Sequence, residues 1–227
     1  MRFPLHDTIY FLVGFLALSL FLHVQVVSAD DIRPYEIAEK LQQQYEKATS
    51  ISAHFTQETS LQLGHGRKRQ GKGSVVIQKP GLMRWDYTEP DPQTIVCDGK
   101  TISIYLEKAK QLMIGDARDY LQSDVTYTFF TGTGDILRDF DILPPDDGKV
   151  RTDGGLRIKL IPKNPHPHVD MVVVLVDPAT YLVRRLEITD RFGSVTTMTF
   201  DHLQLDVPHP DSFFVLHPPP DTEIIRQ

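Results

Sequence analysis

The hydrophobic period of the chain changes from helix-like to strand-like near residue 50. Apolar residues first recur at spacings of three and four: Ile37, Leu41, Tyr45 and Ala48. Pro34 stands where the first turn of a helix accepts a proline, so we predict an amphipathic helix here, with its charged face in solvent. From Ala53 onward apolar and polar residues alternate, which is typical of a strand with one buried face.

Alternating segments then follow one another almost to the end of the chain. Turn residues separate them at Gly64-His65-Gly66, at Lys79-Pro80-Gly81 and at Asp98-Gly99, and the last of these is a typical hairpin turn. Residues 116–140 interrupt the alternation and predict one or two short helices, after which strands return as far as a last one over residues 212–225. We predict a mainly β (α+β) fold of about 10–11 strands, largely antiparallel, because the turns join neighbouring strands and a sheet of this size must curl or close rather than stay flat.

Several of the predicted strands carry bulky or flexible apolar side chains. They are Met83, Trp85, Tyr87, Ile102, Ile104, Leu106, Met198 and Phe200, with Phe129 and Phe130 in the helical insert. Such side chains suit a filled core, and they equally suit an apolar cavity that repacks around a guest. The pattern alone leaves both open. Residues 171–176 are apolar at every position, which predicts a strand covered on both faces.

Residues 1–29 have the features of a secretory signal. Arg2 precedes an apolar run over residues 9–22, and the small residues Val27-Ser28-Ala29 precede Asp30. We expect cleavage after Ala29, which leaves residues 30–227 as one domain in an export compartment. An uncleaved anchor is the alternative, because residues 9–29 could nearly cross a bilayer.

Charge and cysteine content narrow the possible functions. The formal net charge of −6 argues against a nucleic-acid partner, whose phosphates favour a basic face. Cys97 is the only cysteine, so no disulfide can form within the chain. Next to the Asp98-Gly99 turn, Cys97 is expected to be a small buried residue rather than a nucleophile. The chain also lacks the G-x-S-x-G elbow of an esterase, which disfavours a hydrolase with an apolar pocket.

Two polar clusters are candidates for binding. The histidines His166, His168, His209 and His217 invite a metal hypothesis, but prolines around the first pair predict a solvated turn, and we assign no metal site. Arg67, Lys68 and Arg69 stand together at a predicted hairpin tip. They fit a solvated turn, or a docking site for an acidic partner or anionic headgroups.

Four motifs occur in a fixed order along the chain. They are F-T-Q at residues 55–57, G-x-G at 71–73, KPGLMRWDYTEPDPQTIVCDGKT at 79–101 and DSFFVLHPPPDTEII at 211–225. In this order and spacing the chain resembles the periplasmic outer-membrane lipoprotein carrier family, LolA. The resemblance is weakest over residues 109–143.

The resemblance implies an incomplete barrel with a helical lid over an apolar hollow that the bulky residues named above would line. It also implies a periplasmic chaperone that takes acylated lipoproteins from an inner-membrane ABC transporter and passes them to an outer-membrane acceptor. We expect a monomer without a cofactor or enzymatic activity. A lipid- or lipoprotein-sensing regulatory module on the same half-barrel is the alternative.

Single residues also acquire expected roles from the resemblance. Lys79 stands where a family member has an arginine that ties the main chain of the lid to the barrel, and lysine lacks the rigid guanidinium fork. Phe129 and Phe130 would form the apolar underside of the lid. Arg84, which alternates with Trp85, is expected to be solvated on the opposite face of its strand.

Overall fold

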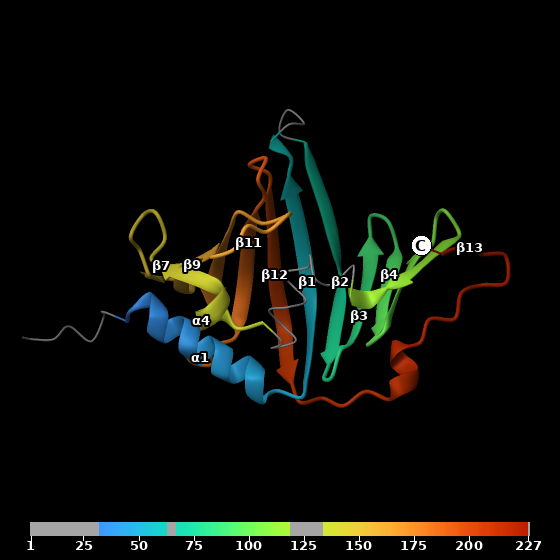
Figure 1. The fold of residues 1–227 in the computed structure, drawn as a ribbon, viewed down its shortest axis with the longest axis horizontal. Helices are drawn as coiled ribbons and strands as arrows, with labels where there is room; N and C mark the ends of the chain where they lie inside the picture. The colour runs from blue at the N-terminus through green and yellow to red at the C-terminus, as the bar shows by residue number, and fades with distance from the viewer. Residues whose placement is uncertain (1–31, 63–66, 119–133, 227) are drawn as a thin grey trace, which may run out of the picture.

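A computed structural model describes residues 32–62, 67–118 and 134–226 (Figure 1). Within these ranges one open sheet of 13 strands has the order β13-β6-β5-β4-β3-β2-β1-β12-β11-β10-β9-β7, and β8 also pairs with β9. The strands are β1 (Ser50–Ser60), β2 (Lys68–Gln78), β3 (Leu82–Glu89), β4 (Gln93–Asp98), β5 (Thr101–Leu106), β6 (Gln111–Asp116), β7 (Phe140–Leu143), β8 (Arg151–Thr152), β9 (Gly155–Pro162), β10 (Met171–Val176), β11 (Val183–Thr189), β12 (Val195–Leu205) and β13 (Glu223–Arg226). The described helices are α1 (Pro34–Lys47), α4 (Ile136–Asp139) and the 3-10 helix η2 (Asp211–Phe214).

The prediction of a mainly β fold with an unclosed sheet is confirmed. The described strands outnumber the predicted 10–11, and β13 pairs with β6 in parallel, so the sheet is not antiparallel throughout. The predicted helix after Pro34 is also confirmed. None of the described helices has the length and apolar character needed to span a membrane. Residues 1–31, the predicted turn at Gly64-His65-Gly66, and Phe129 and Phe130 lie outside the described residues.

Local chemistry explains one hairpin turn and one close approach between neighbouring strands. At the β4–β5 hairpin, the carboxylate of Asp98 accepts the backbone N–H groups of Lys100 and Thr101 at 2.9 and 2.7 Å, and Gly99 supplies a φ of +89°. In the G-x-G motif, β2 runs so close to β3 that a Cβ atom on Gly73 would lie 1.9 Å from the carbonyl oxygen of Asp86. Only glycine fits at that position.

The two faces of the sheet bury different clusters. The inner face carries the large cluster to which Phe55, Trp85 and Phe200 belong, and α1 packs over it beside β7, β9 and α4. The outer face carries the smaller cluster of Val76, Val96 and Phe214. In β10, Val172, Val174 and Val176 are buried whereas the alternate residues are half-buried, so the prediction of full cover on both faces is wrong for one of them.

The structure of the C-terminal segment contradicts two predictions, one about its own strand and one about the surroundings of Arg84. The sequence predicts one strand over residues 212–225, but η2 occupies 211–214 and pairing resumes only at β13, because Pro218, Pro219 and Pro220 carry no backbone N–H. Arg84 is not freely solvated. Its guanidinium pairs with Asp86 at 2.6 Å, donates to the carbonyl oxygen of Phe213 at 3.1 Å and lies 5.0 Å from the centre of the Phe213 ring.

Candidate functional site

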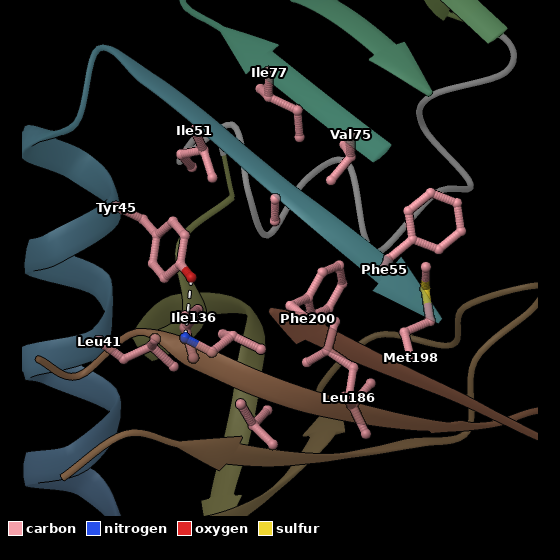
Figure 2. Close-up of a cluster of buried hydrophobic side chains, with 14 of the residues drawn as sticks. Leu41, Tyr45, Ile51, Phe55, Val75, Ile77, Ile136, Leu186, Met198 and Phe200 are labelled. Carbon is pink, nitrogen blue, oxygen red and sulfur yellow. Dashed lines mark hydrogen bonds between the residues drawn. The ribbon is translucent and has the colours of Figure 1, made fainter. Parts of the chain in front are cut away.

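The inner face gathers the apolar residues that the sequence singled out. Met83, Trp85, Ile102, Ile104, Met198 and Phe200 all belong to the large buried cluster, and Tyr87 and Leu106 pack against it. They come from β3, β5 and β12, which lie on both sides of the central strand β1. Figure 2 shows Met198 and Phe200 from β12 near Phe55 from β1, with Leu41 and Tyr45 of α1 on the opposite side of the cluster. These residues form one continuous apolar surface, largely buried in this structure, that joins strands far apart in sequence.

An aromatic group forms part of this surface. The Phe55 ring contacts Trp85 and Tyr87 edge-on, with ring centres 4.9 and 4.8 Å apart, and the Trp85 and Tyr87 rings stack at 6.4 Å. The hydroxyl of Tyr87 donates to the side-chain oxygen of Gln57 at 2.9 Å. Phe55 and Gln57 are the first and last residues of the F-T-Q motif. Phe55 was not among the predicted lining residues, although it shares a strand face with Ala53 and alternates with the polar residues His54 and Thr56.

Two polar groups, the Tyr45 hydroxyl and the Cys97 thiol, are buried within this cluster. The hydroxyl of Tyr45 in α1 accepts the backbone N–H of Val183 in β11 at 3.1 Å (Figure 2), and burial raises the pKa of this tyrosine well above its usual range. Cys97 is fully buried on the same face, and burial raises the pKa of its thiol. The prediction of a small buried cysteine is confirmed. The large cluster of the inner face offers apolar contact, which is favourable because it removes apolar area from water.

Lys79 connects α1 to the turn between β2 and β3. Its ammonium donates to the carbonyl oxygens of Tyr45 at 2.6 Å and Glu46 at 3.0 Å, in the last turn of α1. These carbonyls have no partner within the helix and carry the negative end of the helix dipole. Partial burial lowers the pKa of Lys79, and the negative charges of Glu46 and Asp206 oppose that shift. Lysine thus holds main-chain carbonyls without a guanidinium fork.

Asp206 holds the same junction from the end of β12. Its carboxylate accepts the backbone N–H of Thr49 at 2.7 Å and the Thr49 hydroxyl at 2.9 Å. These hydrogen bonds hold the pKa of Asp206 below its usual value. The exit of α1 is therefore fixed both by β12 and by the β2–β3 turn.

Two of the three candidate docking cations lie beside the aromatic group. Arg67, Lys68 and Arg69 are all exposed, and Lys68 pairs with Glu58 at 2.8 Å. Lys68 and Arg69 line a pocket of about 450 Å³ to which Gln57 and Tyr87 also contribute. The structure thus brings Lys68 and Arg69 next to Tyr87 of the aromatic group, a proximity that the sequence did not reveal.

Within the described residues, the four singled-out histidines do not gather into a group that could hold a metal ion. His166 and His168 lie in the loop between β9 and β10, with ring centres 6.3 Å apart. His209 packs against Phe213 on the outer face, where its backbone pairs with the side chain of Gln78. The first pair therefore lies in a loop, where the sequence predicted a solvated turn, with His168 exposed and His166 half-buried.

Comparison with known proteins gives one consistent result. The family described as Outer membrane lipoprotein carrier protein LolA matches residues 46–217. Two relatives named outer-membrane lipoprotein carrier protein are similar over most of their length. The protein from Alkalilimnicola ehrlichii is 28% identical over 93% of this chain and 92% of its own, and that from Methylobacillus flagellatus is 26% identical over 83% and 88%. A solved structure of an uncharacterized conserved protein from Thermus thermophilus has a TM-score of 0.55 at 15% identity, covers 85% of this chain and 98% of its own, and shares the fold.

Proposed function

Because the chain belongs to the LolA family of outer membrane lipoprotein carrier proteins, we propose that it shields lipoprotein acyl chains against the inner face of its sheet. The observation that carries the proposal is the continuous apolar surface from β5 to β12, built around Phe55, Trp85 and Phe200. Its members are aliphatic, aromatic or methionine side chains, which adapt to a guest without a fixed polar pattern. Such a surface suits cargo of varied acyl composition.

The size of the hydrophobic effect explains why a carrier needs this surface. Each methylene released into water costs about 0.8 kcal/mol, so an acyl chain of a dozen carbons costs on the order of 10 kcal/mol to transfer without cover. Burial against the inner face offsets that cost without any covalent step. We therefore propose a chaperone role that requires neither hydrolysis nor a cofactor.

The route of the cargo follows from the same proposal. Residues 1–29 would direct export and be removed, and residues 30–227 would work in the periplasm as one monomeric domain. An inner-membrane ABC transporter would supply the lipoprotein, and an outer-membrane acceptor would take it by binding it more tightly, because a ligand moves toward the site that holds it better. Arg67 and Arg69, with Lys68, are exposed and fit docking to an acidic patch on such a partner.

Closure of the binding face would depend on α1. Lys79 holds the last carbonyls of this helix, and the Tyr45 hydroxyl holds its buried side to β11. We propose that cargo entry loosens the Lys79 contact, so that the helix and the insert that contains Phe129 and Phe130 act as the lid.

Trp85 allows a direct test, because it is the only tryptophan in the chain. Bromine quenches tryptophan fluorescence only at near contact. We expect a lipoprotein with brominated acyl chains to quench Trp85 saturably, and the same lipoprotein without acyl chains to leave the fluorescence unchanged. Saturable binding without quenching would place the acyl chains away from the inner face. Absence of binding would contradict the carrier function itself.

A charge-reversal variant provides the matched control. Arg67→Glu with Arg69→Glu changes residues assigned to docking and leaves the aromatic group intact. This variant should be quenched as strongly as the unchanged protein. Loss of quenching would show that these arginines take part in cargo binding, and their assignment to partner docking would be wrong.

A further inference from the structure

The outer face carries a three-residue cluster at the centre of the sheet. His54 in β1 lies opposite Asp201 in β12, and His202 follows directly in the chain. Between the pairs Ser52–Gln204 and His54–Asp201, β1 advances by two residues and β12 by three, so β12 contains a β-bulge. His202 has a φ of +49°, which is uncommon for a residue with a side chain.

The bulge places two consecutive side chains on one face. Successive residues of a regular strand point to opposite faces, so Asp201 and His202 would normally diverge. Here Phe200 and Leu203, on either side of them, both pack into the inner cluster. Asp201 and His202 are exposed together with His54, and the two imidazole rings meet edge-on with centres 5.4 Å apart. The irregularity therefore builds the cluster.

The distances fit a metal ion after small side-chain rotations. One potential ligand atom from each residue lies within 4.8 Å of the others, and Nδ1 of His54 is 3.8 Å from Oδ1 of Asp201. A tetrahedral zinc ion with bonds of about 2.1 Å separates neighbouring ligand atoms by about 3.4 Å. The side chains of His54 and Asp201 are 67% and 60% exposed, which leaves them room to rotate.

The surroundings leave room for the ion and its remaining ligands. The cluster opens into a pocket of about 420 Å³ whose wall includes Thr56, Ser74 and Lys72. The ammonium of Lys72 would repel a cation, but it pairs with the carboxylate of Glu89 at 2.8 Å, which offsets its charge. Water or an exogenous ligand can complete the coordination from this pocket.

We propose that His54, Asp201 and His202 bind a divalent transition-metal ion of the Zn²⁺ class. Two imidazoles and one carboxylate suit zinc, cobalt, nickel and copper, whereas calcium and magnesium require mostly oxygen ligands. The ion would join β1 to β12, the two strands that connect the halves of the sheet. The site lies on the face opposite to the apolar surface, so it does not depend on the proposed cargo function.

Metal titration of the untagged protein tests the proposal. We expect Co²⁺ to give a saturable visible absorption spectrum at one ion per chain, Zn²⁺ to displace it, and Zn²⁺ to raise the melting temperature. His202→Asn keeps a residue type that tolerates positive φ, and His54→Gln alters the other strand. Each variant should weaken binding at least tenfold.

His168→Asn is the matched control, because it removes an exposed histidine that also has a second histidine near it. It should bind cobalt and zinc as the unchanged protein does. Absence of binding to the unchanged protein, or equal affinity in His202→Asn and His54→Gln, would overturn the proposal. Loss of metal binding in His168→Asn alone would place the metal site in the β9–β10 loop, and that result would also overturn the proposal.

Discussion

The Lys79 ammonium makes a polar contact between α1 and the sheet whose worth can be measured. Lys79→Met keeps most of the aliphatic stem but leaves the carbonyls of Tyr45 and Glu46 without this donor. Because the site is partly open to water, we expect a loss of about 1 kcal/mol in the free energy of unfolding. Lys79→Arg should retain most of the stability, since a guanidinium can reach both carbonyls. Urea denaturation followed by circular dichroism measures both, and a Met variant as stable as the unchanged protein would refute the contact's role.

At the same scale, the sequence predicted some side-chain positions and missed others. Alternation placed Met83, Trp85 and Tyr87 on the buried face correctly, because strand geometry fixes the direction of each side chain. The environment of Arg84 depends on Phe213, which is distant in sequence. The His54 cluster depends on a bulge and on the pairing of β1 with β12, and neither has a local sequence signal. The binding roles of the lining residues stay predictions.

Among the elements, local patterns predicted those with a regular period. The helix α1 and the hairpin at Asp98-Gly99 follow from spacing and turn chemistry. The C-terminal segment was predicted wrongly because Phe213 and Phe214 pack from η2 without strand pairing, and the three prolines that follow carry no backbone N–H. Phe214 packs against Val76 and Val96 from a 3-10 turn, and the parallel return of β13 to β6 requires tertiary contacts that no alternation encodes.

Phe214 should hold the C-terminal segment on the outer face. Phe214 as a whole is 1% exposed, so Phe214→Ala removes a buried aromatic ring and should destabilise the protein by about 3 kcal/mol. The neighbouring Val215 is 48% exposed, and Val215→Ala should change stability by less than about 0.5 kcal/mol. Urea denaturation with hydrogen exchange over residues 206–226 tests this pair. Equal stability of the two variants, with unchanged protection of the segment, would contradict the assigned packing.

Over the whole molecule, the open sheet separates two kinds of surface. The inner face joins apolar side chains from strands on both sides of β1, and α1 crosses part of it (Figure 1). The outer face is polar at its centre, where His54, Asp201 and His202 lie, and apolar where η2 packs. The sequence predicted an unclosed sheet with one apolar face. It did not predict the strand order, because the pairing of β1 with β12 joins segments more than a hundred residues apart.

Native mass spectrometry after incubation with a detergent-solubilised triacylated lipoprotein tests the carrier account most directly. The account predicts a one-to-one complex that stays soluble once the detergent is removed, and no complex with the same lipoprotein lacking its acyl chains. A lipid-sensing module on the same half-barrel would instead retain free phospholipid or glycolipid and leave the lipoprotein aggregated. That result, or equal binding of the acylated and unacylated forms, would contradict the central claim that the inner face carries lipoprotein acyl chains.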